Sequence, residues 1–109
     1  MRYLEEHGFT ILARNYRTSS GEVDIIAQQG ELIAFVEVKT RQQIFFDVTE
    51  VITPVKQRRI SSAARNFLSR HLYENAHNDF ICRFDVAIFE CHTNKSEVTY
   101  IENAFYGYE

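Results

Sequence analysis

The chain has 109 residues, which is too short for two domains. Its hydrophobic fraction of 45% suits one domain with its own core. No apolar run reaches the ~20 residues of a membrane helix. The N-terminus also lacks the basic and then apolar pattern of a secretion signal, so we expect a cytoplasmic protein with no membrane partner. The two cysteines are too few for a disulfide framework, and neither they nor the four histidines show zinc-site spacing.

The net charge of -3 is distributed unevenly along the chain. Residues 39–70 hold seven lysines and arginines against two acidic residues, whereas residues 71–109 hold two basic residues against seven acidic ones. A protein can therefore present a positive face to phosphates while it is acidic overall. The alternative is an ordinary solvated helix with surface charge.

The first segments are short. Residues Met1–His7 resemble the end of a helix that Gly8 stops in the usual C-terminal position. Residues Phe9–Leu12 form an apolar run suited to a strand, and the polar residues Arg14–Arg17 follow it. A loop is predicted over Thr18–Gly21.

Two segments, Glu22–Gln28 and Leu32–Thr40, are the strongest strand predictions, and a tight hairpin joins them. A two-residue turn over Gly30-Glu31 places Asp24 directly opposite Glu37. A turn one residue earlier shifts the pairing by two and keeps both carboxylates on one face. Because opposite Cβ atoms lie ~4.5–5.5 Å apart, both carboxylates can reach a single cation.

Charged side chains inside these apolar strands require a partner, since desolvating an unpaired charge is costly. Like charges that face each other destabilise a sheet, and a divalent ion removes that penalty. Oxygen ligands suit Mg²⁺, with Mn²⁺ as a substitute. The alternative is a structural triad in which Lys39, on the same face as Glu37, neutralises Asp24 and Glu37.

The next element is a helix that begins after a linker over Gln42–Val51. Thr53 is its N-cap and Pro54 takes the first helical position. Lys56 lies one turn before Ile60 on the apolar stripe, so we expect it to face the sheet near the carboxylates. Snorkelling at the helix start is the alternative. The stripe comprises Ile60, Ala63, Ala64, Phe67, Leu68 and Leu72, with Val55 at one edge.

A strand that is apolar on both faces, Ile81–Glu90, follows this helix. The helical connection from the preceding strand predicts a parallel, right-handed crossover. Arg83 and Asp85 share a face of the strand, and we interpret them as a structural pair. A turn at Thr93-Asn94-Lys95 leads to a last strand, Glu97–Ile101.

An acidic residue followed by a strand with Glu-x-Lys is a phosphodiesterase-type arrangement. Asp24, Glu37 and the main-chain carbonyl of Val38 are candidate ligands for Mg²⁺ beside a scissile phosphate. Lys39 is the candidate for positioning or deprotonating the attacking water and stabilising the transition state. Glu22 shares the Asp24 face and is a candidate third carboxylate.

The stretch Gly21-Glu22-Val23-Asp24-Ile25-Ile26-Ala27, followed by Phe35-Val36-Glu37-Val38-Lys39-Thr40-Arg41, resembles the YraN-like family of bacterial proteins. That family is similar to archaeal Holliday junction resolvases and belongs to the PD-(D/E)xK nuclease superfamily. The resemblance covers nearly the whole chain. Further matching positions are Tyr3-Leu4, Gly8-Phe9, Arg14-Asn15, Lys56-Gln57, Arg83-Phe84-Asp85-Val86 and Asn103-Ala104-Phe105.

The resemblance implies an α/β, restriction-endonuclease-like three-layer fold, with a mixed central β-sheet flanked by helices in one nuclease-like domain over residues 1–109. It also implies Asp24, Glu37 and Lys39 as the motif residues, with Glu22 and Gln57 as accessory residues. The family's first helix begins earlier and carries an acidic residue upstream of Tyr3's position. We therefore expect the first helix to be incomplete here, which bears on the metal site.

Three functions remain open from the sequence. The first is a Mg²⁺-dependent endonuclease acting on DNA, branched or structured DNA included. The second is a DNA-binding or repair-accessory domain with this fold and little or no catalysis, and the third is a plain interaction domain. A resolvase cuts two strands symmetrically, which leaves a homodimer open. The candidate nucleic-acid-binding residues are Arg41, Lys56, Arg58 and Arg59.

Overall fold

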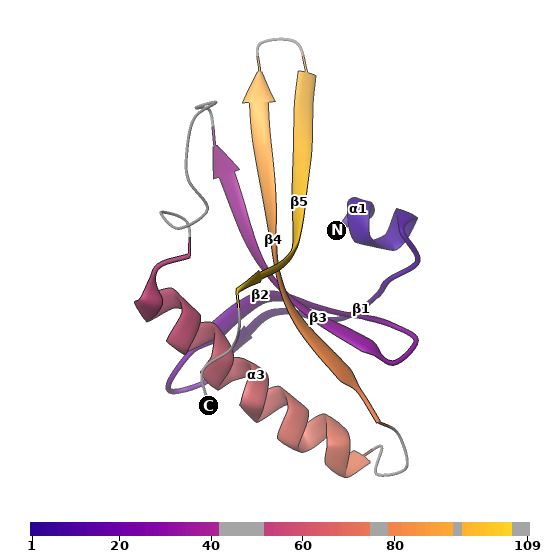
Figure 1. Ribbon diagram of the computed structural model, residues 1–109, viewed down its shortest axis with the longest axis vertical. Coiled ribbons are helices and arrows are strands. Elements are labelled where there is room, and N and C mark those ends of the chain that lie inside the picture. The colour runs from indigo at the N-terminus through magenta and orange to yellow at the C-terminus, as the bar shows by residue number, and fades with distance from the viewer. Residues whose placement is uncertain (42–51, 75–78, 93–94, 106–109) are drawn as a thin grey trace.

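The computed structural model describes the chain apart from residues 42–51, 75–78, 93–94 and 106–109. Within the described ranges, five strands form one sheet in the order β1-β2-β3-β4-β5, in which only the β3–β4 pair is parallel. This mixed sheet with its helices is the predicted α/β fold (Figure 1). The elements are α1 (Arg2–Glu6), β1 (Thr10–Arg17), β2 (Glu22–Gln29), β3 (Leu32–Arg41), α3 (Pro54–Glu74), β4 (Ile81–His92) and β5 (Lys95–Phe105).

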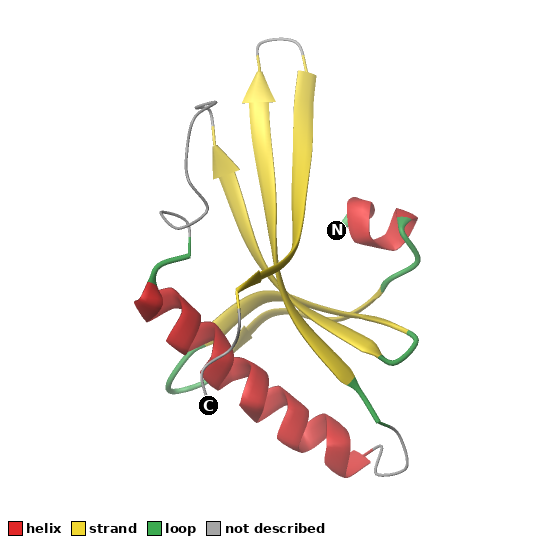
Figure 2. Ribbon diagram, viewed as in Figure 1, coloured by secondary structure: helices red, strands yellow, loops and turns green. Residues whose placement is uncertain are grey.

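The sheet is covered on both faces, which gives three layers (Figure 2). On β3, Ile33 and Phe35 pack towards α3, whereas Ala34 and Val36 pack towards Leu4 of α1. This alternation follows from the two-residue period of a strand. We call these the α3 face and the α1 face of the sheet. Within the described ranges, no helix combines the length and the apolar character needed to cross a membrane.

The β2–β3 hairpin has the predicted register. Gln29 pairs with Leu32 and Ile25 pairs with Val36, so the turn is the two-residue turn over Gly30-Glu31. Gly30 has a φ of 59°, which glycine adopts without the steric cost that other residues incur. The ladder reaches as far as the Ile25–Val36 pair, and Asp24 and Glu37 are the next residues on the two strands.

Helix α3 connects β3 to β4 in the parallel crossover that the sequence predicts. Thr53 caps its start, because the Thr53 Oγ1 accepts a hydrogen bond from the Lys56 N–H at 3.2 Å. Ile60, Ala63 and Ala64 are buried, and Phe67 and Leu68 pack beside them. Val55, which the sequence places at one edge of this stripe, lies on the first turn of the helix and is 57% exposed. The side chain of Leu72 and the linker predicted over 42–51 lie outside the described residues.

Two strands extend much further than the sequence predicts, and the other three exceed their predicted ends by one or two residues. Strand β1 continues through the polar residues Arg14–Arg17 and is an edge strand, where polar side chains face water without cost. Strand β5 starts at Lys95 and ends at Phe105, and Asn103 takes a φ of 54° where its pairing with β4 shifts. The predicted turn began at residues 93–94, outside the described part of the chain.

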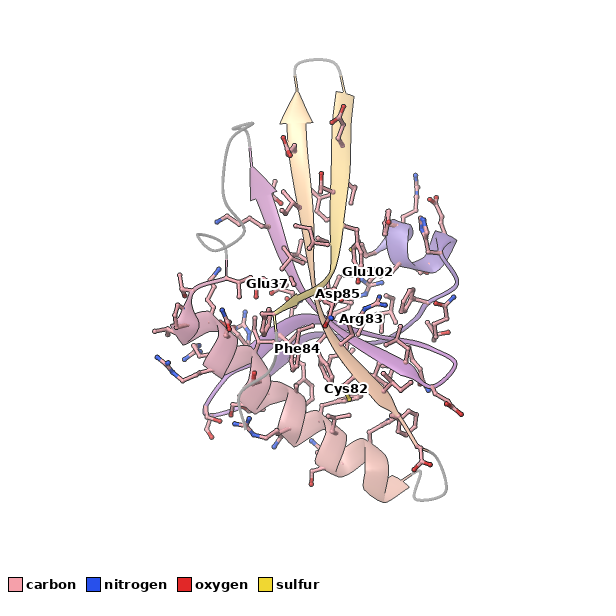
Figure 3. All side chains as sticks on the ribbon, in the orientation of Figure 1. Glu37, Cys82, Arg83, Phe84, Asp85 and Glu102 are labelled. Atoms are coloured by element: carbon pink, nitrogen blue, oxygen red, sulfur yellow. The ribbon has the colours of Figure 1, made fainter. Side chains whose placement is uncertain are left out.

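A buried carboxylate ties β4 to β5 (Figure 3). Asp85 is fully buried and accepts three hydrogen bonds from Arg83, at 2.8, 3.1 and 2.9 Å, which confirms the predicted structural pair. The Tyr100 O–H donates to Asp85 at 2.5 Å and the Asn103 N–H donates at 2.9 Å. Burial, and then the bond to Asp85, raise the pKa of Tyr100. The Tyr100 ring also stacks on Tyr3 at 5.1 Å, so this network holds α1 in place as well.

Candidate functional site

Two carboxylates meet where β2 and β3 run side by side on the α3 face. The Val38 N–H donates a hydrogen bond to Asp24 Oδ2 at 2.8 Å, which fixes the Asp24 carboxylate across the hairpin. Glu37 is the residue before Val38, and only 14% of its side chain is exposed. Figure 3 shows Glu37 on β3 near the start of α3. The structure therefore brings together the two acids that the hairpin register predicts.

The proximity of these acids changes their chemistry. Burial, followed by the charge of Asp24, raises the pKa of Glu37 from 4.5 to about 7, and a hydrogen bond between the two side chains adds to the rise. The ammonium of Lys56 acts in the opposite direction. Near neutral pH the pair is therefore poised between one and two negative charges, and any added cation favours the doubly charged state.

Lys56 supplies the nearest positive charge. Its Nζ lies 3.7 Å from Glu37 Oε1, as expected from the position of Lys56 on the apolar stripe of α3. The ammonium is only partly hydrated, with 44% of the side chain exposed. A cavity of about 110 Å³ lies between these groups. It is lined by Glu22, Asp24, Glu37, Lys56, Arg59 and Ile60.

Glu22 contributes to this cavity through ion pairs with two arginines. Its carboxylate lies 3.5 Å from Arg17 Nε and 3.8 Å from Arg59 Nη2. The preceding residue, Gly21, allows this arrangement, because a Cβ atom there would lie 1.9 Å from the carbonyl oxygen of Arg59. The loop before β2 is thus in close backbone contact with the first turns of α3.

Strand β2 departs from strict alternation at Asp24. Val23 packs on the α3 face but Ile25, two residues on, packs on the α1 face. The neighbouring strand explains the departure, since Asn15 lies between the partners of Ile25 and Val23 and has a φ of 51°. Asp24 consequently borders a second, more open cavity of about 370 Å³ on its other side. Its other lining residues are Arg14, Asn15, Ile25 and Val38.

Not every candidate residue lies at the cavity. Lys39 is exposed and, among the described residues, forms no ion pair with either acid, so Lys56 rather than Lys39 partly neutralises them. Gln57 donates to the Ile52 carbonyl at 3.2 Å and so braces the chain that enters α3. Arg58 is exposed on α3, outside the cavity lining, and the side chain of Arg41 lies outside the described residues.

Arg14, Arg17 and Gly21 have structural contacts that the sequence pattern does not predict. Arg17 pairs with Glu22 across the β1–β2 ladder, and Arg14 is opposite Ile25 in the same ladder. The polar residues that follow the apolar start of β1 were the available signal for the two arginines. A strand predicted to continue through these residues would have paired Arg14 and Arg17 with β2. Gly21 gave no comparable signal, because its contact with α3 is a tertiary one.

The donor set fits a hard divalent ion. Two carboxylates side by side, one of them with a raised pKa, are oxygen ligands whose mutual repulsion a cation relieves. Mg²⁺ in nucleic-acid enzymes is typically held by one or two carboxylates, with waters and substrate phosphates completing its shell. No group of three or more acidic, histidine or cysteine side chains close enough for a metal occurs in the described ranges, so the fit is to a two-carboxylate site.

Comparison with known proteins places the chain in a family. A family model described as "Uncharacterised protein family UPF0102" matches residues 1–89. The chain belongs to this family. UPF0102 proteins similar to it include one from Nitrosomonas eutropha, 38% identical over 104 residues that cover 94% of this chain and 83% of that protein. A member from Geotalea daltonii is 42% identical over 105 residues (94% and 80%), and one from Caldicellulosiruptor saccharolyticus is 43% identical over 110 residues (96% and 88%).

Membership of UPF0102 confirms the resemblance to the YraN-like family, and the family model covers both strands of the hairpin and the whole of α3. The family description names no reaction. The argument for function therefore rests on the geometry of the cavity.

Proposed function

We propose that this chain is a Mg²⁺-dependent endonuclease that hydrolyses phosphodiester bonds in DNA, with branched or otherwise structured DNA as the preferred substrate. The observation that carries the proposal is the pair formed by Asp24 and Glu37 in a cavity that also presents Lys56 and Arg59. In this small cavity the Asp24–Glu37 pair supplies ligands for a divalent ion, and Lys56 and Arg59 supply contacts for a phosphate.

Each residue has a definite task under this proposal. Asp24 and Glu37 hold the divalent ion, which, when bound, neutralises phosphate charge and lowers the pKa of a coordinated water. The hydrogen bond from the Val38 N–H keeps the Asp24 carboxylate oriented towards the cavity. Lys56 leaves Glu37 for a phosphate oxygen once the carboxylate has another cation. Arg59 binds a second phosphate oxygen and is held in position by Glu22.

Lys39 acts from the rim of the site. It lies two residues beyond Glu37 on β3, so both side chains start from the same face of the strand. Its exposed side chain is free to reorient when a charged substrate approaches, and a lysine ammonium then stabilises the negative charge that develops on the phosphate. This role requires substrate binding to bring Lys39 inwards.

The position of Lys39 favours a second candidate, a DNA-binding or repair-accessory domain with little catalysis. A lysine that remains at the rim leaves the attacking water without a positioning group. The positive groups on α3 would still bind phosphates.

Cleavage assays separate the two candidates. Labelled linear duplex, flapped duplex and four-way junction are incubated with Mg²⁺, Mn²⁺ or EDTA, and product is measured together with DNA binding. The endonuclease proposal predicts metal-dependent cleavage that falls at least about 100-fold in Glu37→Gln and Lys39→Ala, a loss typical of removing transition-state stabilisation. Binding without cleavage in any metal supports the accessory role.

Glu31→Gln is the matched control. It removes a carboxylate from the exposed turn of the same hairpin, away from the cavity. Cleavage that persists in Glu37→Gln at the rate of Glu31→Gln rules out the endonuclease proposal.

A further inference from the structure

A second hollow lies further along the seam between β1 and α3. It has a volume of about 280 Å³. Between the carboxylate cavity and this hollow, two side-chain hydrogen bonds join α3 to β1 and to the loop that follows β1. One links the hydroxyls of Ser20 and Ser62, and the other runs from the Tyr16 O–H to Asn66 Oδ1. The hollow is lined by Leu12, Ala13, Tyr16, Phe67, Arg70 and His71.

Aromatic rings make its walls rigid. Phe67 meets Tyr16 edge to face at 5.5 Å and stacks on His71 at 5.2 Å, with 18° between the two ring planes. His71 in turn contacts the ring of Phe80 at 5.0 Å. Rings that are already fixed offer contact area to a flat ligand at little entropic cost.

The charge along the seam is positive. Arg59, Ser62, Asn66 and Arg70 follow one another at spacings of three and four residues, so they share one face of α3. Arg59 lines the carboxylate cavity and Arg70 lines the hollow. With the 1.5 Å rise per residue of a helix, the two arginines are about 16 Å apart along α3. A nucleic-acid strand can therefore follow this face from one site to the other.

We propose that this hollow binds a single unpaired nucleobase of the DNA, with its phosphate against Arg70. Base–aromatic stacking beside a positive groove is how proteins bind single-stranded nucleic acid. A volume of 280 Å³ is slightly below the range of about 300–1,000 Å³ for sites that take drug-sized molecules, so it suits one ring system and not two. A base inside a duplex cannot enter, because its faces are covered by its neighbours.

This inference rests on the proposed function and sharpens it. The site selects DNA with a nucleotide outside the double helix, at a fixed distance from the bond that is cut. At a duplex-like spacing of 3.4 Å per nucleotide, 16 Å corresponds to about five nucleotides, and to fewer when the strand is extended.

The test uses oligonucleotides that carry 2-aminopurine, a base whose fluorescence falls when it stacks. In one set the 2-aminopurine is unpaired, and in the other it lies inside a blunt duplex. The wild-type chain is expected to quench the unpaired base and to bind it about 5- to 150-fold more tightly than the duplex, as expected for one stacked base. Ala13→Leu, which fills the hollow, and Arg70→Gln are both expected to abolish the preference. Ala13→Leu should leave duplex affinity unchanged.

Arg65→Gln is the matched control, because it removes one positive charge from an exposed position on the same helix. Thermal unfolding verifies that each variant is folded, and Arg70→Gln tests the inference if Ala13→Leu is not. A folded Ala13→Leu that keeps the preference overturns the inference, as does an equal loss in Arg65→Gln and Arg70→Gln.

Two further outcomes separate the proposed base-binding hollow from the proposed endonuclease function. Wild-type protein that cleaves DNA without preference for an unpaired base overturns the inference and leaves the proposed function standing. Wild-type protein that binds no DNA in any metal overturns both. A smaller sedimenting mass in Ala13→Leu than in wild type shows that a second copy of the chain occupies the hollow, and this also overturns the inference.

Discussion

Replacement of Glu37 by glutamine is expected to stabilise the fold at alkaline pH in the absence of metal. The pKa of Glu37 rises from 4.5 to about 7 on folding. Between these two values the native state keeps a proton that the unfolded chain has released, so the stability of the wild type falls as the pH rises from 4.5 to 7. Below this window both states are protonated and above it both are ionised, so the contribution is constant on either side.

The size of the effect follows from the shift. At 1.36 kcal/mol per pKa unit, the rise from 4.5 to about 7 corresponds to about 3 kcal/mol between the two ends of the window. This figure already includes the attraction of Lys56, which lowers the pKa of Glu37. Because glutamine resembles the protonated acid, the variant is expected to be about 3 kcal/mol more stable than the wild type at pH 8 and nearly equal to it at pH 4.5.

The measurement is urea unfolding in EDTA across this pH range. Glu22→Gln is the control, because it removes a half-exposed carboxylate from the same cavity and should follow the pH dependence of the wild type. A Glu37→Gln variant that is less stable than the wild type at pH 8 refutes the idea that the two acids repel each other.

The same pair of proteins tests the metal site. Saturating Mn²⁺ is expected to stabilise the wild type by about 2.7 kcal/mol at 100 times the dissociation constant, because the ion binds only the folded site. The same concentration of Mn²⁺ should stabilise Glu37→Gln much less, because the variant lacks one of the two carboxylate ligands. Equal gains in the two proteins would place any bound ion elsewhere.

Three other changes have defined outcomes. Gly21→Ala places a Cβ atom 1.9 Å from the carbonyl oxygen of Arg59. The free energy of unfolding measured in urea should therefore fall by about 1–3 kcal/mol, as it does when a core is overpacked. Asp85→Asn leaves Arg83, whose side chain is only 19% exposed, poorly paired, and should lower the free energy of unfolding by about 3–5 kcal/mol in the same assay. Lys56→Ala removes the cation that lowers the pKa of Glu37, and the titration of Glu37 followed by NMR should move to higher pH.

The sequence predicts the fold well wherever a short-range rule applies. The turn over Gly30-Glu31 sets the hairpin register, and Thr53 with Pro54 sets the start of α3. These two local signals suffice to bring Asp24 and Glu37 together under α3.

The remaining features depend on contacts between segments far apart in the chain. Alternation along β3 gives Lys39 the same face as Glu37, and the apolar stripe of α3 predicts Lys56 near the acids. Neither pattern shows that Lys56, rather than Lys39, forms the ion pair with Glu37. The extension of β1 through Asn15 depends on pairing with β2 and on a positive φ that polar composition alone does not reveal. The bend at Asn103 likewise depends on the buried Asp85.

The order in which these contacts form has a consequence for folding. Asp24 and Glu37 are 13 residues apart in a hairpin, whereas Lys56 reaches them only after α3 has docked on the sheet. Local contacts form faster than long-range ones, so the nascent hairpin brings two negative charges together before their cation arrives. Acidic pH or divalent ions should consequently act on the folding rate as well as on the unfolding rate. The residues proposed for catalysis would then also set the speed at which the domain assembles.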